Sequence, residues 1–495
     1  MAHYEDGAVK GSGLRQYTGR GGGFEDLVAV TDSSTGPVAV SDVDGDGILE
    51  VFVGGGCGRG RYPEAAASRL YRNPGGRLEV DRDNTAVLAQ AGLVSGAAFT
   101  DLDGDGGPEL VLACEWGPIR IWRNRQGRLE PWDVPLAWPS GVVPRVPAAA
   151  DGRPVARLSQ LTGWWNAITA GDFDGDGRLD LVAANWGRNT KYERHRARPL
   201  ELWFGNLNQD GVLALVEAYY DPGLKKVVPA RQLDVLAHSL PFLRARFPSH
   251  RAFSLAGVED VLGESRHTAG RLEANWLEST LFLNRGDHFE PRPLPVEAQM
   301  APAFGVCVGD LDGDGHADLF LAQNFFAVQP ETARYDGGRG LCLQGDGRGG
   351  FAPVSGQDDG VAVYGEQRGA ALADYDADGR LDLVVTQNGA ATRLFHNLRA
   401  QPGLRVRLRG PAGNPTAVGA LLRPILGASM GPAQEVRAGA GYWSQDSAVL
   451  VVGPVAELTG LWIRWPGGRE SRIPVPGGAR EVAVTPSGDC EVIGR

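Results

Sequence analysis

Five short acidic loops carry the residue types in this sequence that could do chemistry. Each loop has an aspartate at positions 1, 3 and 5, glycine at position 6 and an acid at position 9. Alternate carboxylates can converge on one point, and calcium takes six to eight oxygen ligands at roughly 2.3–2.6 Å. Glycine at position 6 permits the sharp turn that lets the carbonyl of position 7 face the ion. We therefore expect about five calcium sites, with the ligands Asp42, Asp44, Asp46, Glu50; Asp101, Asp103, Asp105, Glu109; Asp172, Asp174, Asp176, Asp180; Asp310, Asp312, Asp314, Asp318; and Asp374, Asp376, Asp378, Asp382.

The context of these loops excludes two familiar calcium motifs. An EF-hand needs a bidentate glutamate at position 12 on a helix, and a dockerin loop opens a helix. Position 12 here is apolar and lies in an expected strand, as Val53, Leu112, Ala183, Leu321 or Val385. Ions in such loops hold turns together without reacting, so a structural role is expected and no catalytic residue is assigned.

A degenerate sixth copy has the residues Asn206, Asn208, Asp210 and Gly211, with Ala214 where the last acid should be. It offers fewer charges than the other loops. A plain turn is favoured over a metal site there.

The elements that position the acidic loops are short strands. A run of small and apolar residues precedes each loop, and another, such as VFVGG or LVVTQN, follows it. A further apolar stretch ends in Asn73, Asn124, Asn284 or Asn397, which indicates a third strand entering a turn toward a fourth. Four strands per repeat is a propeller blade. The sequence therefore predicts an all-β fold.

The spacing of the loops predicts the number of blades. The loops begin at residues 42, 101, 172, 310 and 374, so the interval before the fourth loop is about twice the others. One extra blade is expected to start at the degenerate loop, and another to use strands around Phe253–Val258 and Ser279–Asn284. The prediction is a seven-bladed, integrin α-like β-propeller.

The same long interval contains helical periodicity over residues 229–262. Leu233, Leu236, Leu240, Leu243 and Phe247 recur every three or four residues, and Pro241 is expected to divide the segment into two short helices. The segment is interpreted as a helical insertion packed on a blade edge. A lid that moves over a site is the alternative.

Bulk composition narrows the classes of partner. The chain has 495 residues and a net charge of −11, and five divalent ions would add about +10. This acidity argues against nucleic acid as a partner.

The five cysteines form no Cys-x-x-Cys pair, so neither a zinc site nor a disulfide framework is indicated. The residues after Met1 show no basic region followed by an apolar run, and no stretch of about 18 apolar residues suggests a membrane span.

The strand-loop-strand units resemble the FG-GAP/VCBS repeats of integrin α-subunits and many bacterial proteins, and Phe304-Gly305 supplies the Phe-Gly of that motif. Composition changes near Gln401. The stretch after it resembles the ASPIC/UnbV domain, through Gly403-Leu404-Arg405-Val406, Gly439-Ala440-Gly441-Tyr442-Trp443-Ser444-Gln445 and Leu461-Trp462-Ile463-Arg464-Trp465. The expected division is a propeller over residues 1–400 and a small β-sandwich-like domain over residues 401–495.

Together these regions resemble the cartilage acidic protein family and its bacterial relatives. The resemblance implies calcium in the five loops and a secreted or periplasmic recognition or adhesion module. It implies no established chemistry. This chain differs from the animal members in having no cysteine-rich module.

A ligand site is expected on the face opposite the acidic loops. Segments after the second strands should ring a central funnel there, with aromatic rings to stack on sugars and amides to fix orientation. The alternative is that these side chains pack the funnel and cap turns. The candidate ligand-binding residues are Trp116, Asn185, Trp186, Arg188, Tyr192, Asn324 and Asn388.

Two other functions compete with binding of a glycan or protein ligand. One is a carbohydrate-active lyase or hydrolase with its site in the funnel, for which Arg188, Tyr192 and His195 would be the first candidates. No metalloprotease, nucleophile-elbow or P-loop motif supports an enzyme, although a site assembled from several blades leaves no linear trace. The other is a structural spacer within a larger polypeptide. The sequence leaves the oligomeric state open.

Overall fold

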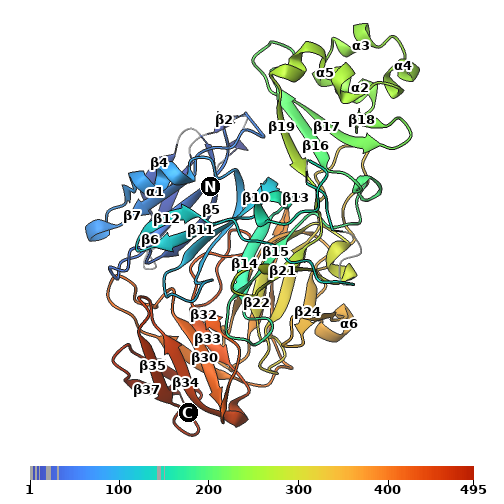
Figure 1. The fold of residues 1–495 in the computed structure, drawn as a ribbon. Coiled ribbons are helices and arrows are strands. Elements are labelled where there is room, and N and C mark those ends of the chain that lie inside the picture. The colour runs from blue at the N-terminus through green and yellow to red at the C-terminus, as the bar shows by residue number, and fades with distance from the viewer. Residues whose placement is uncertain are drawn as a thin grey trace.

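Antiparallel sheets are the main regular structure of the computed structural model (Figure 1), which describes residues 4–5, 8–9, 12–17, 24–30, 33–58, 60–141, 146–149 and 151–494. Met1, where a leader would begin, lies outside the described residues. No helix in the described ranges is both long and apolar enough to span a membrane.

Five of the sheets follow one another along the chain and have an acidic loop between their first and second strands. We call them blades 1 to 5. Blade 1 has β5 (Ser33–Ser41), β6 (Glu50–Gly58), β7 (Arg69–Arg72) and β8 (Glu79–Val80); blade 2 has β9 (Leu93–Thr100), β10 (Glu109–Pro118), β11 (Arg120–Arg125) and β12 (Arg128–Pro131), with β13 (Thr162–Trp164) paired to β10; blade 3 has β14 (Ala167–Gly171), β15 (Asp180–Ala184), β20 (Thr280–Asn284) and β21 (Phe289–Pro293); blade 4 has β22 (Ala303–Gly309), β23 (Asp318–Gln323), β24 (Leu341–Gly345) and β25 (Phe351–Pro353); blade 5 has β26 (Glu366–Ala373), β27 (Asp382–Asn388) and β28 (Ala390–Phe395).

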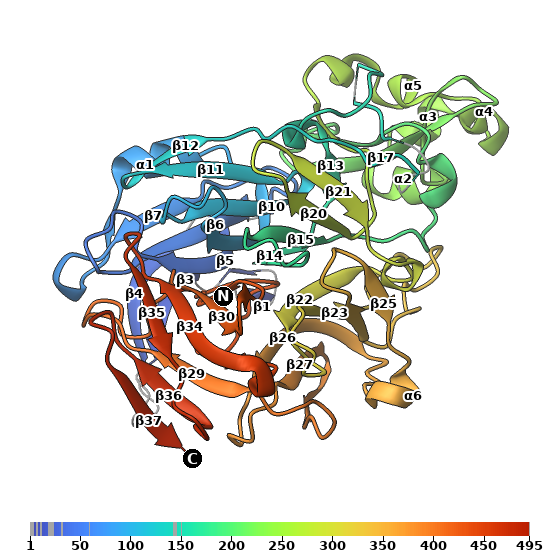
Figure 2. The same cartoon turned by 60° about the horizontal axis from the view of Figure 1, so that its bottom comes forward.

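The first strands of successive blades pack side by side, in the order β5, β9, β14, β22 and β26. Figure 2 shows the blades as a curved series in the same order. Small residues allow this approach, since a Cβ on Gly96 of β9 would lie 2.9 Å from the Cα of Ala167 in β14. The runs of glycine and alanine before each acidic loop therefore form the inner wall of the fold.

The predicted seven blades are not confirmed, because the two extra blades do not form as expected. β16 (Leu200–Gly205), β17 (Ala214–Asp221), β18 (Lys226–Pro229) and β19 (Gly270–Ala274) make a separate sheet, inserted between the second and third strands of blade 3. The degenerate loop joins β16 to β17. β20, expected in a blade of its own, is the third strand of blade 3.

Helices occupy the rest of this insertion, which projects from the blades in Figure 1. They are α2 (Leu233–Ser239), α3 (Leu243–Arg246), α4 (His250–Ser254) and α5 (Val258–Leu262). The strand expected around Phe253–Val258 is wrong, because Ser249 caps α4 by accepting the Ala252 N–H at 3.1 Å and Phe253 packs into the helical cluster.

Residues 404–494, which we call the C-terminal region, form two sheets that share one apolar core. Leu422, Ile463 and Val482 are fully buried in it. One sheet has the order β33-β29-β36-β37 and the other β31-β30-β34-β35 with β32 beside β30. Their bounds are β29 (Leu404–Leu408), β30 (Leu421–Leu426), β31 (Ser429–Met430), β32 (Gln434–Glu435), β33 (Val449–Val452), β34 (Leu458–Arg464), β35 (Glu470–Pro474), β36 (Glu481–Val484) and β37 (Cys490–Gly494).

The remaining elements are short. β1 pairs with β2, and β3 pairs with β4. Their bounds, with those of the two other α-helices, are β1 (Tyr4–Glu5), β2 (Ala8–Val9), β3 (Ser12–Tyr17), β4 (Phe24–Val30), α1 (Arg82–Leu88) and α6 (Gly356–Asp359).

A hairpin of the C-terminal region, residues 438–447, lies among the first strands of all five blades. We call it the axial hairpin. Its backbone and side chains make hydrogen bonds with β5, β9, β14 and β26, and Gly441 abuts Val306 of β22. The bonds are Val40 N–H to Ala438 O at 2.8 Å, Trp443 Nε1–H to Ser95 O at 3.0 Å, Gly441 N–H to Ile168 O at 3.0 Å and Leu372 N–H to Asp446 Oδ1 at 2.8 Å.

Glycine is required where the axial hairpin meets the strands. A Cβ on Gly439 would lie 2.3 Å from the Val38 carbonyl oxygen, and the φ of Gly439 is 94°. Both the space and the left-handed backbone exclude a larger residue there. The Gly-Ala-Gly-Tyr-Trp-Ser stretch therefore fills the axis of the blades.

Candidate metal centres

The first aspartate of each acidic loop organises the loop's backbone. In the first loop, Asp42 accepts the N–H of Gly45 at 2.8 Å and the N–H of Gly47 at 3.0 Å. Gly47 has a φ of 85°, so glycine at position 6 permits this closure. The position 6 N–H makes the same bond to the first aspartate in the four other loops.

The acid at position 9 ties the loop to the strands behind it. Asp180 accepts the Phe173 N–H at 2.9 Å and the Asn284 N–H at 2.7 Å. Glu109, Asp318 and Asp382 likewise accept one N–H from loop position 2 and another from the end of the third strand. This acid therefore anchors the loop as well as facing its centre.

Carboxylates at positions 1, 3 and 9 converge in the first four loops. Within each group the ligand oxygens lie within 4.8 Å of one another. The groups are Asp42, Asp44 and Glu50; Asp101, Asp103 and Glu109; Asp172, Asp174 and Asp180; and Asp310, Asp312 and Asp318. In the fifth loop, Asp376 and Asp378 converge with His396, a residue that the sequence had not suggested as a ligand.

The position 5 aspartates each make a local contact with the backbone of their own loop, and their predicted role as ligands stays a prediction. Asp46 accepts the Ile48 N–H at 2.8 Å, and the equivalent bond recurs in every loop. The signal for this contact was present in the sequence, since an aspartate two residues before a turn amide commonly accepts its N–H.

Burial makes these acids costly to ionise on their own. It raises the pKa of Glu109 to about 8, with added repulsion from Asp103 and Asp101. It likewise raises the pKa of Asp318 to about 8, of Glu50 to about 7 and of Asp172 to about 6. A bound cation would stabilise the charged forms, so the electrostatics of the loops suit a metal ion.

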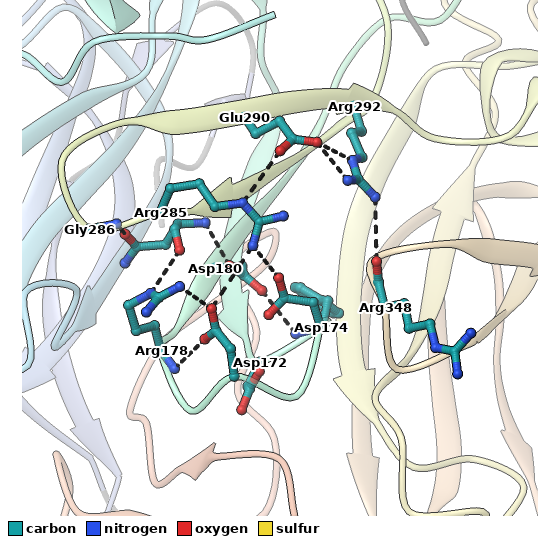
Figure 3. Close-up of polar contacts among 12 residues, drawn as sticks. Asp172, Asp174, Arg178, Asp180, Arg285, Gly286, Glu290, Arg292 and Arg348 are labelled. Atoms are coloured by element: carbon teal, nitrogen blue, oxygen red, sulfur yellow. Dashed lines mark hydrogen bonds and ion pairs between the residues drawn. The ribbon is translucent and has the colours of Figure 1, made fainter. Parts of the chain in front are cut away.

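Two buried oxygens in the third loop have no hydrogen-bond partner among the described residues. They are Oδ1 of Asp172 and Oδ1 of Asp174 (Figure 3). Buried polar atoms are normally satisfied, so each orphan oxygen calls for an explanation such as an ion or water. A donor set made of carboxylate oxygens fits a hard cation such as calcium, and the third loop therefore fits the expected ion.

Basic side chains from the third strands lie beside the position 3 aspartates. Arg72 is 3.5 Å from Asp44, and Arg123 is 3.0 Å from Asp103. Arg285 pairs with Asp174 in Figure 3. In the fourth loop the uncharged Gln344 contacts Asp312. The loops therefore share one backbone design but differ in local charge.

The asparagines that end the third strands link neighbouring blades, a role that the sequence did not reveal. Their side-chain amides donate to the position 2 carbonyl of the preceding blade's loop. The bonds are Asn124 to Val43, Asn284 to Leu102 and Asn397 to Leu311, each at 2.8 Å. Blade 4 uses the Gly349 N–H, which donates to Phe173 O at 2.9 Å. The repeated asparagine was the available signal.

The degenerate loop keeps the turn and the position 5 acid, Asp210, but has no acid at positions 1, 3 and 9. Gly211 donates to Asn206 Oδ1 at 3.0 Å, and Val212 donates to Asp210 at 2.9 Å. Asn208 donates to Ser239 O in α2 at 2.6 Å. The loop is thus held by its own amides and by a helix, and its interpretation as a plain turn stays a prediction.

Most of the predicted ligand-binding residues are buried. Trp116, Trp186 and Tyr192 belong to one apolar cluster, in which Trp164 stacks on Trp186 with ring centroids 4.1 Å apart. Asn185 and Asn324 are fully buried and cap turns, through bonds to Trp164, Trp186 and Gly338.

The remaining candidates for ligand binding or catalysis are not members of that cluster. Arg188 pairs with Glu193 at 2.7 Å, and Asn388 donates to Glu366 at 3.2 Å. His195 stacks on Tyr219. The axial hairpin lies among the first strands, where a funnel was expected, and a role of these residues in ligand binding stays a prediction.

A cleft of about 530 Å³ lies between the aromatic cluster and the insertion. Tyr62, Trp116 and Trp164 line one side, while β17 and α2 line the other. Glu217, also on the wall, is 3.4 Å from Arg231. The cleft therefore has aromatic rings on one side and the charged pair Glu217–Arg231 on the other.

Comparison with known proteins identifies part of the repeat. The model of the FG-GAP-like repeat family matches residues 42–112 and 101–183. Cartilage acidic protein 1 of Xenopus tropicalis is 23% identical over 374 residues, and that of Mus musculus 25% identical over 363 residues. Each alignment covers 69% of this chain and 47% of the relative. The chain thus spans about half the length of these curated relatives.

Two solved structures align with the chain at low similarity. The exotype rhamnogalacturonan lyase YesX has 14% identity and a TM-score of 0.30, covering 97% of this chain and 76% of that one. The V. cholerae biofilm matrix protein Bap1 has 12% identity and a TM-score of 0.25, covering 92% and 63%. TM-scores of this size do not establish a shared fold.

Proposed function

We propose, because the chain carries FG-GAP-like repeats and is related to cartilage acidic protein 1, that it is a calcium-binding β-propeller that acts as a recognition or adhesion module. The observation that carries the proposal is the repeated convergence of buried carboxylates in the acidic loops. The orphan oxygens of Asp172 and Asp174 add to it.

Calcium would have a structural role in this module. Bound in a loop, the ion would neutralise the converging carboxylates and offset the cost of burying them. The residues of the chain would hold the loop ready, through the position 6 N–H and the anchored acid at position 9. We propose that the twenty loop acids named from the sequence are the carboxylates available to about five ions.

The organisation of the chain is proposed on the same basis. The propeller would extend over residues 1–400, with the helical insertion at about 229–262, and residues 401–495 would be an ASPIC/UnbV-like domain. Relatedness to cartilage acidic protein 1 supports this division and a secreted or periplasmic location. The full number of blades stays a prediction.

The ligand is proposed to be a glycan or a protein, bound on the face that carries the aromatic cluster. The cleft beside Tyr62, Trp116 and Trp164 supports this placement, because aromatic rings and a Glu217–Arg231 pair can stack on and hydrogen-bond to a ligand. Among the original candidates, only Trp116 lines that cleft.

A calcium titration combined with a binding screen tests the proposal. Purified protein is stripped with chelator and titrated with calcium by isothermal calorimetry, and the calcium-loaded protein is then screened on glycan and protein arrays. Saturable calcium binding and an array hit that Trp164→Ala removes would support it. Absence of calcium binding at millimolar concentrations would remove its basis.

A further inference from the structure

The C-terminal region lies against the acidic loops, and two of its arginines form ion pairs with the first aspartates of two loops. Arg464 of β34 pairs with Asp101, the first aspartate of the second loop, and donates to the Gly104 carbonyl at 2.9 Å. Arg405 of β29 pairs with Asp374, the first aspartate of the fifth loop, and donates to its carbonyl at 3.1 Å. Each guanidinium therefore lies against a loop's first carboxylate.

These arginines are held in place by the C-terminal region. The Arg405 side chain is 7% exposed and pairs with Glu481 at 2.9 Å. That of Arg464 is 15% exposed and projects from a central strand of its sheet. An arginine keeps its positive charge at any ordinary pH. Two fixed positive charges are thus present where calcium would approach.

The first and fourth loops have a different environment. Asp42 and Asp310 accept hydrogen bonds from the glycines of their own loops. Among the described residues, no arginine of the C-terminal region forms an ion pair with either. The fourth loop has the least positive surroundings, since Gln344 takes the place that Arg72 or Arg123 has elsewhere.

The third loop is intermediate. The Ala433 N–H donates to Asp172 Oδ2 at 2.8 Å. The guanidinium of Arg423 in β30 lies beside Gly177 of the same loop, but among the described residues it forms no ion pair with Asp172. Oδ1 of Asp172 stays without a partner. The contact holds the carboxylate in position and leaves its other oxygen free for an ion.

We infer that Arg464 weakens calcium binding at the second loop and that Arg405 weakens it at the fifth loop. The loops then fall into a tight class, with high affinity for calcium, and a weak class, with low affinity. The inference rests on the proposed calcium function. A positive charge about 5 Å from a divalent ion repels it by an amount worth about tenfold in affinity even in high dielectric. The first and fourth loops belong to the tight class, and the second and fifth to the weak class.

The coupling is reciprocal. If docking of Arg464 weakens calcium binding by a given factor, calcium in the second loop weakens that docking by the same factor. Filling the weak loops therefore loosens the hold of the C-terminal region on the blades. Calcium concentration would then set how firmly the C-terminal region is attached.

Calorimetric calcium titration of Arg464→Gln and Arg405→Gln tests the inference. Each variant is expected to bind calcium about tenfold more tightly in one weak loop, with the tight class unchanged. Arg472→Gln is the control, because it changes an exposed arginine of β35 that forms no ion pair with any described residue. Weaker or unchanged affinity in both variants would overturn the inference while the wild type still bound calcium. A wild type that binds none would instead overturn the proposed function.

A wild-type measurement covers the case in which a variant fails to fold. Arginine side-chain Nε–H signals are followed by NMR during a calcium titration of the full chain. The Arg464 and Arg405 signals should shift only in the later, weaker binding phase. Signals that stay unchanged through saturation, or that move with the first ions, would contradict the two classes.

Discussion

The side-chain amide of Asn284 in blade 3 lies 2.8 Å from the carbonyl oxygen of Leu102 in the second acidic loop, and donates to it. Asn284 also donates to Leu179 O at 3.0 Å in its own blade. One amide thus joins two loops that belong to neighbouring blades.

Replacing this amide should loosen the contact between blades. Asn284→Ala leaves two buried carbonyls without their donor, so we expect the free energy of unfolding to fall by about 1–3 kcal/mol. Urea denaturation with calcium present measures the change. Asn388→Ala, at an exposed asparagine, is the control and should change stability little. Equal stability of the two variants would show that the bond contributes nothing.

Calcium should raise the melting temperature of the chelated protein. An ion that binds only the folded state stabilises it by about 2.7 kcal/mol per site at a concentration one hundred times the dissociation constant. Differential scanning calorimetry with calcium and with chelator measures the shift, and magnesium at equal concentration is the control. An unchanged melting temperature at millimolar calcium would contradict occupied loops.

The chelated protein should lose stability as pH rises. Folding raises the pKa of Glu109 and of Asp318 to about 8 and of Glu50 to about 7, mainly through burial. Between the ordinary value of 4.5 for Glu109 and about 8, the folded state keeps a proton that the unfolded state has released. Unfolding then releases protons, so the stability from these groups is complete below the unfolded pKa and is lost toward pH 8.

Denaturation of the chelated protein between pH 5 and pH 8 measures this trend. Calcium should flatten it, because the ion holds the acids in their charged form. A chelated protein that becomes more stable over the same range would mean that these carboxyls are ionised in the folded state without an ion.

Removing one carboxylate from the third loop should remove one calcium. Asp174→Asn deletes a charge whose Oδ1 is a buried orphan, so we expect one fewer bound ion per chain. Atomic absorption after gel filtration gives the ratio. Asp210→Asn in the degenerate loop is the matched control and should leave the ratio unchanged. Loss of an ion in the control would assign a metal to the degenerate loop.

A larger residue in the axial hairpin should prevent the blades from closing on it. A Cβ on Gly439 would lie 2.3 Å from Val38 O, and its φ of 94° disfavours any side chain. Gly439→Val is therefore expected to cost at least about 3 kcal/mol or to abolish folding. Gly477→Ala, where a Cβ meets no atom within 4 Å, should be tolerated. Circular dichroism melts compare the two.

Repetition in the sequence was sufficient to predict the local structure of the loops. Asp42 to Glu50 and its four counterparts have the glycines, acids and flanking strands that the structure contains, because the chemistry of one loop is fixed by residues near one another in the chain. The interval before Asp310 could not be resolved in the same way. Its strands lie between β15 and β20 of a single blade, and pairing partners so far apart leave no periodic signal.

Contacts between the C-terminal region and the acidic loops could also not be predicted from the sequence. Arg464 meets Asp101, and Ala433 meets Asp172, across more than two hundred residues of chain. The Gly-Ala-Gly-Tyr-Trp-Ser stretch suggested a domain motif, but nothing in its composition indicated that it would lie among five strands. Long-range packing depends on the assembled shape, which local patterns do not encode.

The order of synthesis gives the axial hairpin a particular place in the assembly of the protein. Residues 438–447 leave the ribosome after blades 1 to 5 have been made, so the newly made blades do not yet have the axial hairpin between them. Until then Val40 and Leu372 lack acceptors for their amides, and Ile168 and Ser95 lack donors. Blades made without this segment would leave these four backbone groups unpaired, so the propeller part alone is expected to be less stable than the whole chain.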